Sequence, residues 1–331
     1  MQTINLFDRI LPMIGNTPLL KISLKYKGRL HNIFAKAEYY NITGSIKDRV
    51  AYYILKEAYN TNAITPSSVI SEATSGNTGI SFAALGSYLG HKVIIFMPEW
   101  MSKERINIMK SYGAEVRLVS KAEGGFLGSI DMAKNVNNAF LPSQFSNINN
   151  VNAHYHLTAS EILRQFETLN LTVDAVVAGV GTGGTIMGLA KRLKEANKSL
   201  KAYPLEPLNS PTLSTGFKVG AHKIQGISDE FIPEILKLNT LEHVISVDDN
   251  DSIIMAQMLS QKLGIGVGIS SGANLLGAIK VQEEIGLNAN VVTVFADDNK
   301  KYLSTDYSDK LPIKSDYMTN DIELVSLEAI R

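Results

Sequence analysis

Residues 175–185 read AVVAGVGTGGT, a short apolar run followed by a glycine-rich loop. Its first four residues are small and apolar, which indicates a short buried strand, and a helix is expected to begin near Ile186. The loop between them, residues 179–185, holds four glycines and two threonines. Glycines let the backbone wrap around an anion, and threonine hydroxyls add donors at a helix N-terminus. The stretch therefore predicts a strand–loop–helix unit that binds phosphate, with a tight structural turn as the alternative.

This loop differs from two common phosphate-binding motifs. It is not a P-loop, because no Lys-Ser/Thr pair ends it, and it lacks the glycine spacing of a dinucleotide fingerprint. The loop therefore matches neither motif.

Short apolar runs of the same kind alternate with helical segments along the chain. Most of these runs are nearly continuous, as in strands that are buried on both faces of a parallel sheet. Repeated strand–helix alternation indicates an open α/β fold. The expected strands are residues 33–37, 68–71, 93–97, 115–119, 175–178, 202–205, 243–247 and 291–295, and the polar segment 142–153 is expected to link two lobes.

Composition sets limits on the function. The chain has 331 residues, of which 45% are apolar and 19% charged, as in a globular protein of one large or two medium domains. The formal net charge is zero, which argues against nucleic-acid binding. There is no cysteine, so any sulfur chemistry uses sulfur carried by a substrate. No signal peptide or membrane-spanning run is evident, and a cytoplasmic protein without a membrane partner is expected.

A second segment, residues 44–49 (GSIKDR), places Lys47 after a Gly-Ser turn and at the start of a helix. The positive end of the helix dipole disfavours the ammonium form of a lysine, and Schiff-base formation requires the neutral amine. The alternative is a solvated helix N-terminus in which Asp48 and Arg49 pair. Taken alone, the segment favours the solvated helix N-terminus over a Schiff-base lysine.

Two further loops are rich in small polar residues and precede helices. Residues 74–79 (TSGNTG) present hydroxyl, amide and backbone donors, which suit a substrate carboxylate, although an ordinary helix cap has the same composition. Residues 268–274 (GISSGAN) open a later helix and are equally compatible with a tight helix entry. His154 and His156 alternate without an evident third ligand, so a structural role is preferred and no metal site is expected.

Together and in this order, these segments resemble the fold-type II pyridoxal-phosphate (PLP) enzymes, in particular the cysteine synthase and cystathionine β-synthase group. The resemblance covers nearly the whole chain. It rests on several blocks, residues 14–19, 44–49, 74–79, 181–185, 222–227, 268–272 and 302–305. Several matches in the same order are far more specific than any single one.

The resemblance implies an architecture. It consists of two open-sheet, three-layer α/β lobes of the tryptophan-synthase-β-like type, with the cofactor between them. The large lobe, residues 1–40 plus 152–331, would bind the PLP phosphate. The small mobile lobe, residues 41–151, would carry the substrate-carboxylate loop. A homodimer is implied as well.

The resemblance also implies residue roles. Lys47 would hold PLP as a Schiff base and act as general base, and Asn77 would bind the cofactor 3′ oxygen. Ser270 would face the pyridine nitrogen; a neutral partner there favours β-elimination to an aminoacrylate. The cofactor phosphate would be held by Gly181, Thr182, Gly183, Gly184 and Thr185. The substrate carboxylate would be held by Thr74, Ser75, Thr78 and Gln144.

The chain departs from typical cysteine synthases in one segment near the expected active-site mouth. Residues 228–231 read SDEF where those enzymes have a small, Gly/Ala-type stretch. Asp229 or Glu230 would activate water or a thiol, or repel an anionic nucleophile, in the second half-reaction. The alternative is a pair of carboxylates at a helix start. Ile42, where the family usually has proline, also weakens an assignment to O-acetylserine.

Three functions are therefore considered. The first is a cysteine-synthase-like β-replacement, in which O-acetylserine or a similar amino acid reacts with sulfide or a thiol. The second consumes L-cysteine, releases hydrogen sulfide and forms lanthionine or serine. The third is a non-catalytic relative, against which the retention of Lys47, Asn77 and the phosphate loop argues.

Overall fold

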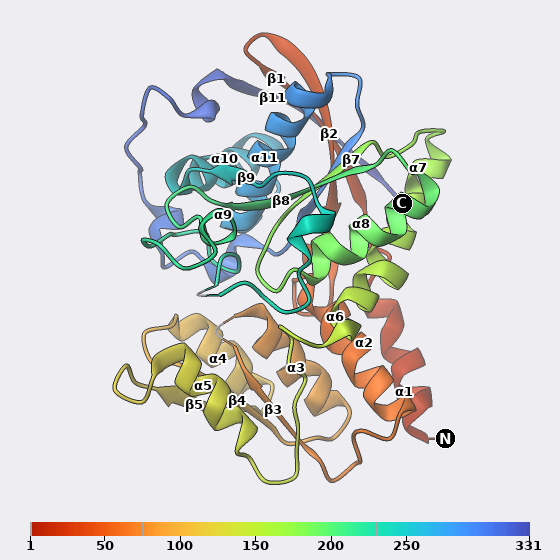
Figure 1. Ribbon diagram of the computed structural model, residues 1–331, viewed down its shortest axis with the longest axis vertical. Helices are drawn as coiled ribbons and strands as arrows, with labels where there is room; N and C mark the ends of the chain where they lie inside the picture. The colour runs from red at the N-terminus through yellow and green to blue at the C-terminus, as the bar shows by residue number, and fades with distance from the viewer. Residues whose placement is uncertain (1, 75, 230) are drawn as a thin grey trace. The chain divides into compact units, whose positions relative to one another are not determined.

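The computed structural model describes residues 2–74, 76–229 and 231–331. It divides into two compact units: a first unit, Met1–Gly15 with Asn41–Asn150, and a second unit, Asn16–Tyr40 with Val151–Arg331. Each unit is built on one sheet with helices packed against it (Figure 1). The expected α/β class is confirmed.

Helix α1 (Gln2–Ile10) belongs to the first unit because it packs on α2 (Lys47–Asn60). The ring centroid of Phe7 lies 5.7 Å from that of Tyr52 and 5.7 Å from that of Tyr59, in edge-on geometry. This aromatic cluster explains why residues 1–15 group with the first unit, whereas the sequence analysis placed them with residues 152–331.

The first unit contains a parallel sheet with the strand order β5-β4-β3-β6. A Cβ on Gly86 would lie 2.4 Å from Val93 Cγ2, so one face packs closely on α3. On the other face, Ser71 Oγ donates a hydrogen bond of 2.9 Å to the carbonyl of Ala133 in α5. The elements are β3 (Val69–Ala73), β4 (Val93–Pro98), β5 (Glu115–Val119), β6 (Ala139–Phe140), α3 (Asn77–Tyr88), α4 (Lys103–Ser111) and α5 (Gly125–Lys134).

The second unit contains a mixed sheet with the order β11-β1-β2-β10-β7-β8-β9. The five strands from β2 to β9 in this order are parallel, and β1 and β11 add an antiparallel edge. The strands are β1 (Leu19–Tyr26), β2 (Arg29–Ala37), β7 (Ala175–Gly179), β8 (Lys201–Pro207), β9 (Ile245–Val247), β10 (Val291–Phe295) and β11 (Ile322–Ile330). The helices are α7 (Ala159–Thr168), α8 (Gly184–Ala196), α9 (Thr212–Thr215), α10 (Asp249–Leu263) and α11 (Ile269–Ile285).

Helices cover both faces of the second sheet (Figure 1). Gly277 of α11 packs on one face, where an added Cβ would lie 2.3 Å from Leu205 Cδ1 and 3.2 Å from Val177 Cγ1. On the other face, Phe34 of β2 contacts Phe166 of α7, with ring centroids 4.8 Å apart. The near-continuous apolar runs of the sequence are therefore strands with two buried faces.

The expected strands are all present, but the sequence analysis missed β1, β6 and β11. Helix α6 (Ile148–Ala153) carries the chain from one unit to the next, within the segment expected to link two lobes. The loops after β3 and β7 follow the carboxyl ends of parallel strands, the edge where open α/β sheets bind ligands. Within the described ranges, the helices lack the length and apolar character that a membrane span needs.

Candidate active site

Lys47 is the first residue of α2, and the buried carboxylate of Asp48 fixes its surroundings. Asp48 accepts hydrogen bonds from the backbone N–H of Thr43 (2.8 Å), from Thr43 Oγ1 (2.6 Å) and from Ser81 Oγ in α3 (2.6 Å). The backbone N–H of Lys47 donates to Ser45 Oγ at 3.3 Å. The start of α2 is thus tied to α3. The sequence analysis read Asp48 only as a partner of Arg49 and missed this role.

The predicted carboxylate loop joins β3 to α3. Three of the four residues expected to hold the carboxylate, Thr74, Thr78 and Gln144, lie in or next to this loop. Thr78 Oγ1 donates to Gln144 Oε1 at 2.7 Å, and Gln144 Nε2 lies 3.5 Å from the carbonyl oxygen of Ala73. Thr74 Oγ1 accepts from the backbone N–H of Gly76 at 3.3 Å. Asn77 begins α3, and Ser75 lies outside the described residues. The arrangement offers hydroxyl and amide groups beside a helix N-terminus, which suits a carboxylate.

Glu72 is a buried carboxyl group two residues before Thr74, and the sequence analysis missed it. Burial raises the pKa of Glu72 to about 7, and the backbone N–H groups of Ala73, Gln144 and Ser143 oppose that rise. Its Oε1 accepts from the Ala73 N–H at 3.1 Å, whereas Oε2 has no hydrogen-bond partner in the described part of the chain. An acidic residue inside the apolar run VISEA was the available signal.

The predicted phosphate loop follows β7 in the second unit. Asn274 of α11 holds its start: Oδ1 accepts from the Gly179 N–H at 2.8 Å, and Nδ2 donates to the Val294 carbonyl of β10 at 2.7 Å. Gly183 precedes α8 with φ +86°, a left-handed conformation that favours glycine. The first backbone N–H groups of α8, from Gly184 onward, and the hydroxyls of the loop are donors of the kind that suit an anion.

Two of the glycines also have a packing role, because the loop lies against residues 226–228. A Cβ on Gly181 would lie 2.5 Å from the carbonyl oxygen of Gly226, and one on Gly179 would lie 2.8 Å from Ile227 Cγ2. The backbone N–H of Ser228 donates to the Val180 carbonyl at 2.8 Å. The phosphate loop and the segment that leads to Asp229 are therefore one packed assembly. Asp229 is partly buried, and Glu230 lies outside the described residues.

Ser270 lies in the first turn of α11 and is buried. The neighbouring backbone is fixed, since the Gly268 N–H donates to the Asp297 carbonyl at 2.9 Å and Ser271 Oγ accepts from the Ala296 N–H at 3.1 Å. Among the residues that the structure describes, the Ser270 hydroxyl has no hydrogen-bond partner. It is available to a ligand.

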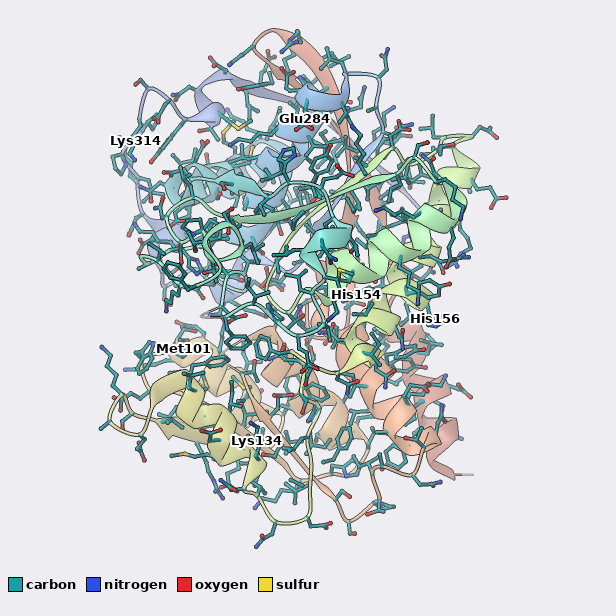
Figure 2. All side chains as sticks on the ribbon, viewed as in Figure 1. Met101, Lys134, His154, His156, Glu284 and Lys314 are labelled. Atoms are coloured by element: carbon teal, nitrogen blue, oxygen red, sulfur yellow. The ribbon has the colours of Figure 1, made fainter. Side chains whose placement is uncertain are left out.

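The two histidines considered for a metal site have separate surroundings, and Figure 2 marks both. His154 is buried, with Nδ1 3.1 Å from Thr158 Oγ1 and Nε2 3.3 Å from Thr185 Oγ1 at the start of α8. His156 contacts the ring of Tyr155, with ring centroids 4.7 Å apart. His154 therefore supports the phosphate loop.

These groups fit PLP. The glycine-lined loop, whose residue 181 has no room for a Cβ, and the α8 N-terminus suit a phosphate dianion. The unpartnered Ser270 hydroxyl suits a pyridine nitrogen, and Lys47 at a helix N-terminus suits an aldehyde.

Comparisons with known proteins agree with this chemistry. The family model for pyridoxal-phosphate dependent enzymes matches residues 10–297. The crystal structure of a hydrogen sulfide-producing enzyme from Fusobacterium nucleatum matches with a TM-score of 0.94 and 54% identity, over 97% of this chain and 98% of that chain.

Two further relatives represent the two directions of β-replacement that the sequence analysis considered. A mutant of a hydrogen sulfide-producing enzyme, with one Asp replaced by Asn and in complex with an α-aminoacrylate intermediate, matches with a TM-score of 0.94 and 54% identity, over 96% of this chain and 97% of that chain. Cysteine synthase B from Campylobacter jejuni is 44% identical over 303 residues, 90% of this chain and 98% of the relative.

Proposed function

The chain belongs to the pyridoxal-phosphate-dependent enzyme family, and on that basis we propose that it catalyses β-replacement on L-cysteine, releasing hydrogen sulfide and forming serine or lanthionine. Its cofactor is PLP, and it is an enzyme of sulfur amino-acid metabolism. The direction of the reaction and the residue roles below are our proposal.

PLP would be held through Lys47, Asn77 and Ser270, and its phosphate by residues 181–185. When bound, PLP supplies an electron sink for the bonds at the α-carbon. Thr74, Ser75, Thr78 and Gln144 would hold the substrate carboxylate, which orients the Cα–H bond toward Lys47.

The remaining steps are proton transfers by the residues of this chain. In the first half-reaction, Lys47 takes the α-proton, and the electron pair of the Cβ–S bond leaves with sulfur as hydrosulfide, which takes a proton from solvent to give hydrogen sulfide. In the second half-reaction, a new Cβ–O or Cβ–S bond forms, the proton of the nucleophile passes to Asp229 and from it to solvent, and Lys47 returns the α-proton to Cα. L-cysteine and water give L-serine and hydrogen sulfide; two L-cysteine molecules give lanthionine and hydrogen sulfide.

The observation that carries this direction is the position of Asp229 in the chain, directly after a residue that is hydrogen-bonded to the phosphate loop. Ser228 is bonded to Val180 of that loop, and Asp229 follows directly. A carboxylate disfavours an approaching hydrosulfide anion, as Coulomb repulsion requires, but it accepts a proton from neutral water or a thiol. The Asp-to-Asn mutant of the hydrogen sulfide-producing enzyme that holds an α-aminoacrylate supports an aspartate acting after the first half-reaction.

The second candidate is the cysteine-synthase-like direction, from O-acetylserine or a similar amino acid and sulfide to L-cysteine. The 44% identity to cysteine synthase B favours it. Because both directions share the first half-reaction, only the leaving group and the nucleophile separate them.

One experiment distinguishes the three functions. Purified enzyme is incubated with L-cysteine alone, and sulfide, serine and lanthionine are measured; parallel reactions contain O-acetylserine with sulfide. We expect sulfide release from L-cysteine with equimolar serine or lanthionine. Cysteine formation from O-acetylserine without sulfide release from L-cysteine would establish the second candidate. Absence of an absorbance band at about 410 nm would support a non-catalytic relative.

The family resemblance also leads us to propose a cytoplasmic homodimer in which the lobe formed by residues 41–151 moves during the cycle. Light scattering coupled to size-exclusion chromatography tests the dimer.

A further inference from the structure

Ser228 has an unusual backbone conformation for a residue with a side chain. Its φ is +58°, in the left-handed region that favours glycine. Non-glycine residues remain there only where the surrounding structure over-determines them, and such positions cluster at functional sites. Ser228 directly precedes Asp229, so its conformation sets the direction in which the chain presents Asp229.

All polar groups of Ser228 are engaged. Its N–H donates to the Val180 carbonyl at 2.8 Å, and its carbonyl oxygen lies 3.0 Å from His222 Nε2. Its Oγ donates to the Ser210 carbonyl at 2.9 Å and lies 3.2 Å from Thr212 Oγ1. Ser228 is buried, so these bonds are shielded from competing water.

The partners of Ser228 are themselves anchored. The buried carboxylate of Glu206 accepts from the Leu213 N–H at 2.7 Å, which fixes the turn that holds Ser210 and Thr212. The carboxylate of Asp249 accepts from the Lys223 N–H at 2.8 Å, next to His222. These contacts connect the loops after β7 and β8, and through Lys223 the start of α10, to Ser228 and its neighbour His222.

We propose that Ser228, clamped by His222 and by its own hydroxyl, is a positioning residue that aims Asp229 at the nucleophile of the second half-reaction. The inference rests on the proposed role of Asp229. A glycine at this position adopts the same φ without strain but loses the hydroxyl anchor and gains backbone freedom. Serine therefore fixes the direction of the chain at Asp229, which a glycine would leave free to vary.

The test separates the two half-reactions of the holoenzyme with L-cysteine. Exchange of the α-proton with deuterium oxide reports the first half-reaction, and the steady-state formation of serine and lanthionine reports the second. We expect Ser228→Gly to leave α-proton exchange within about twofold of the wild type and to slow product formation by about tenfold or more, because small misplacements of reacting groups carry costs of this size.

Two matched variants complete the test. Asn170→Gly replaces another residue with positive φ (+53°), at the exposed end of α7, and is expected to change neither rate. His222→Leu should slow product formation as Ser228→Gly does, whereas His222→Gln, which keeps a donor, should restore most of the rate. Cofactor content, measured by visible absorbance, checks that each variant is folded and loaded.

The double variant Ser228→Gly with Asp229→Asn shows whether Ser228 acts through Asp229. If Ser228 works through Asp229, Ser228→Gly should cost less than about twofold in an Asp229→Asn background. A full cost in that background, or a Ser228→Gly enzyme with wild-type product formation, overturns the inference while the role of Asp229 stands. Wild-type rates for Asp229→Asn overturn that role and, with it, the inference.

Discussion

The buried carboxyl group of Glu72 makes stability depend on pH in a defined direction. Burial raises its pKa from 4.5 to about 7, so the folded chain holds a proton that the unfolded chain releases. The stability that this proton confers is fully present below pH 4.5 and is lost as the pH rises through about 7. The loss amounts to about 3 kcal/mol above that range, at about 1.4 kcal/mol for each pH unit between the two values.

The perturbation that isolates this effect is Glu72→Gln, which keeps the shape of the side chain and removes its ionisation. We expect the difference in unfolding free energy, variant minus wild type, to increase by about 2 to 3 kcal/mol between pH 5 and pH 8. The gain arises because the wild type must bury a carboxylate whose Oε2 has no hydrogen-bond partner in the described residues.

Urea unfolding of the PLP-loaded proteins at both pH values measures this difference. Glu328→Gln, at an exposed position of β11, controls for the loss of one surface charge. A difference that stays constant from pH 5 to pH 8 would refute the reasoning, because it would mean that Glu72 does not change its charge in this range.

Three further predictions concern the candidate active site. Lys47→Ala should abolish turnover and the absorbance band at about 410 nm; a variant with normal kcat would contradict the mechanism. Gly181→Ala should weaken PLP binding at least about tenfold in a cofactor titration, because its Cβ would lie 2.5 Å from the Gly226 carbonyl oxygen; unchanged affinity would show that the loop adjusts freely. Asp48→Ala should lower the unfolding free energy by about 3 kcal/mol in urea, since it leaves three donors from Thr43 and Ser81 without their acceptor; a loss below about 1 kcal/mol would mean that water replaces the carboxylate.

Local sequence predicted most of the parallel strands, because runs such as VIIFMP (β4) and VVTVF (β10) are apolar on both faces and are buried on both. Strand β1 was missed although LLKISLKY alternates apolar and polar residues from Leu20 onward, the pattern of a strand with one buried face. Strand β11 was missed as well, and its sequence IELVSLEAI does not alternate strictly. Their pairing joins residues about 300 positions apart, such as Leu19 with Ile330, and no local signal specifies such a partner. The antiparallel edge of the sheet therefore depends on a pairing between distant residues, which only the structure shows.

The candidate site shows the same division between local and distant information. The loops that carry Lys47, Thr74 and Gly181 were located correctly at helix starts, because small polar residues before a helix are a local signal. The contacts that fix these loops, such as Asp48 with Ser81, depend on side chains brought together by the fold. The left-handed backbone of Ser228 is in the same class, since a serine gives no sign of a positive φ.

The packing of the phosphate loop against residues 226–228 constrains how any change at Asp229 is interpreted. The loop and this segment share the bond from Ser228 to Val180 and the close approach of Gly181 to Gly226. A substitution at Asp229 that shifts this backbone therefore shifts the phosphate cradle as well. A rate lost through misplaced PLP would appear in both half-reactions, whereas a rate lost through the missing carboxylate would appear only in the second. We therefore expect Asp229→Asn to keep the PLP affinity and the α-proton exchange of the wild type, and a parallel loss of both would assign its effect to the cradle.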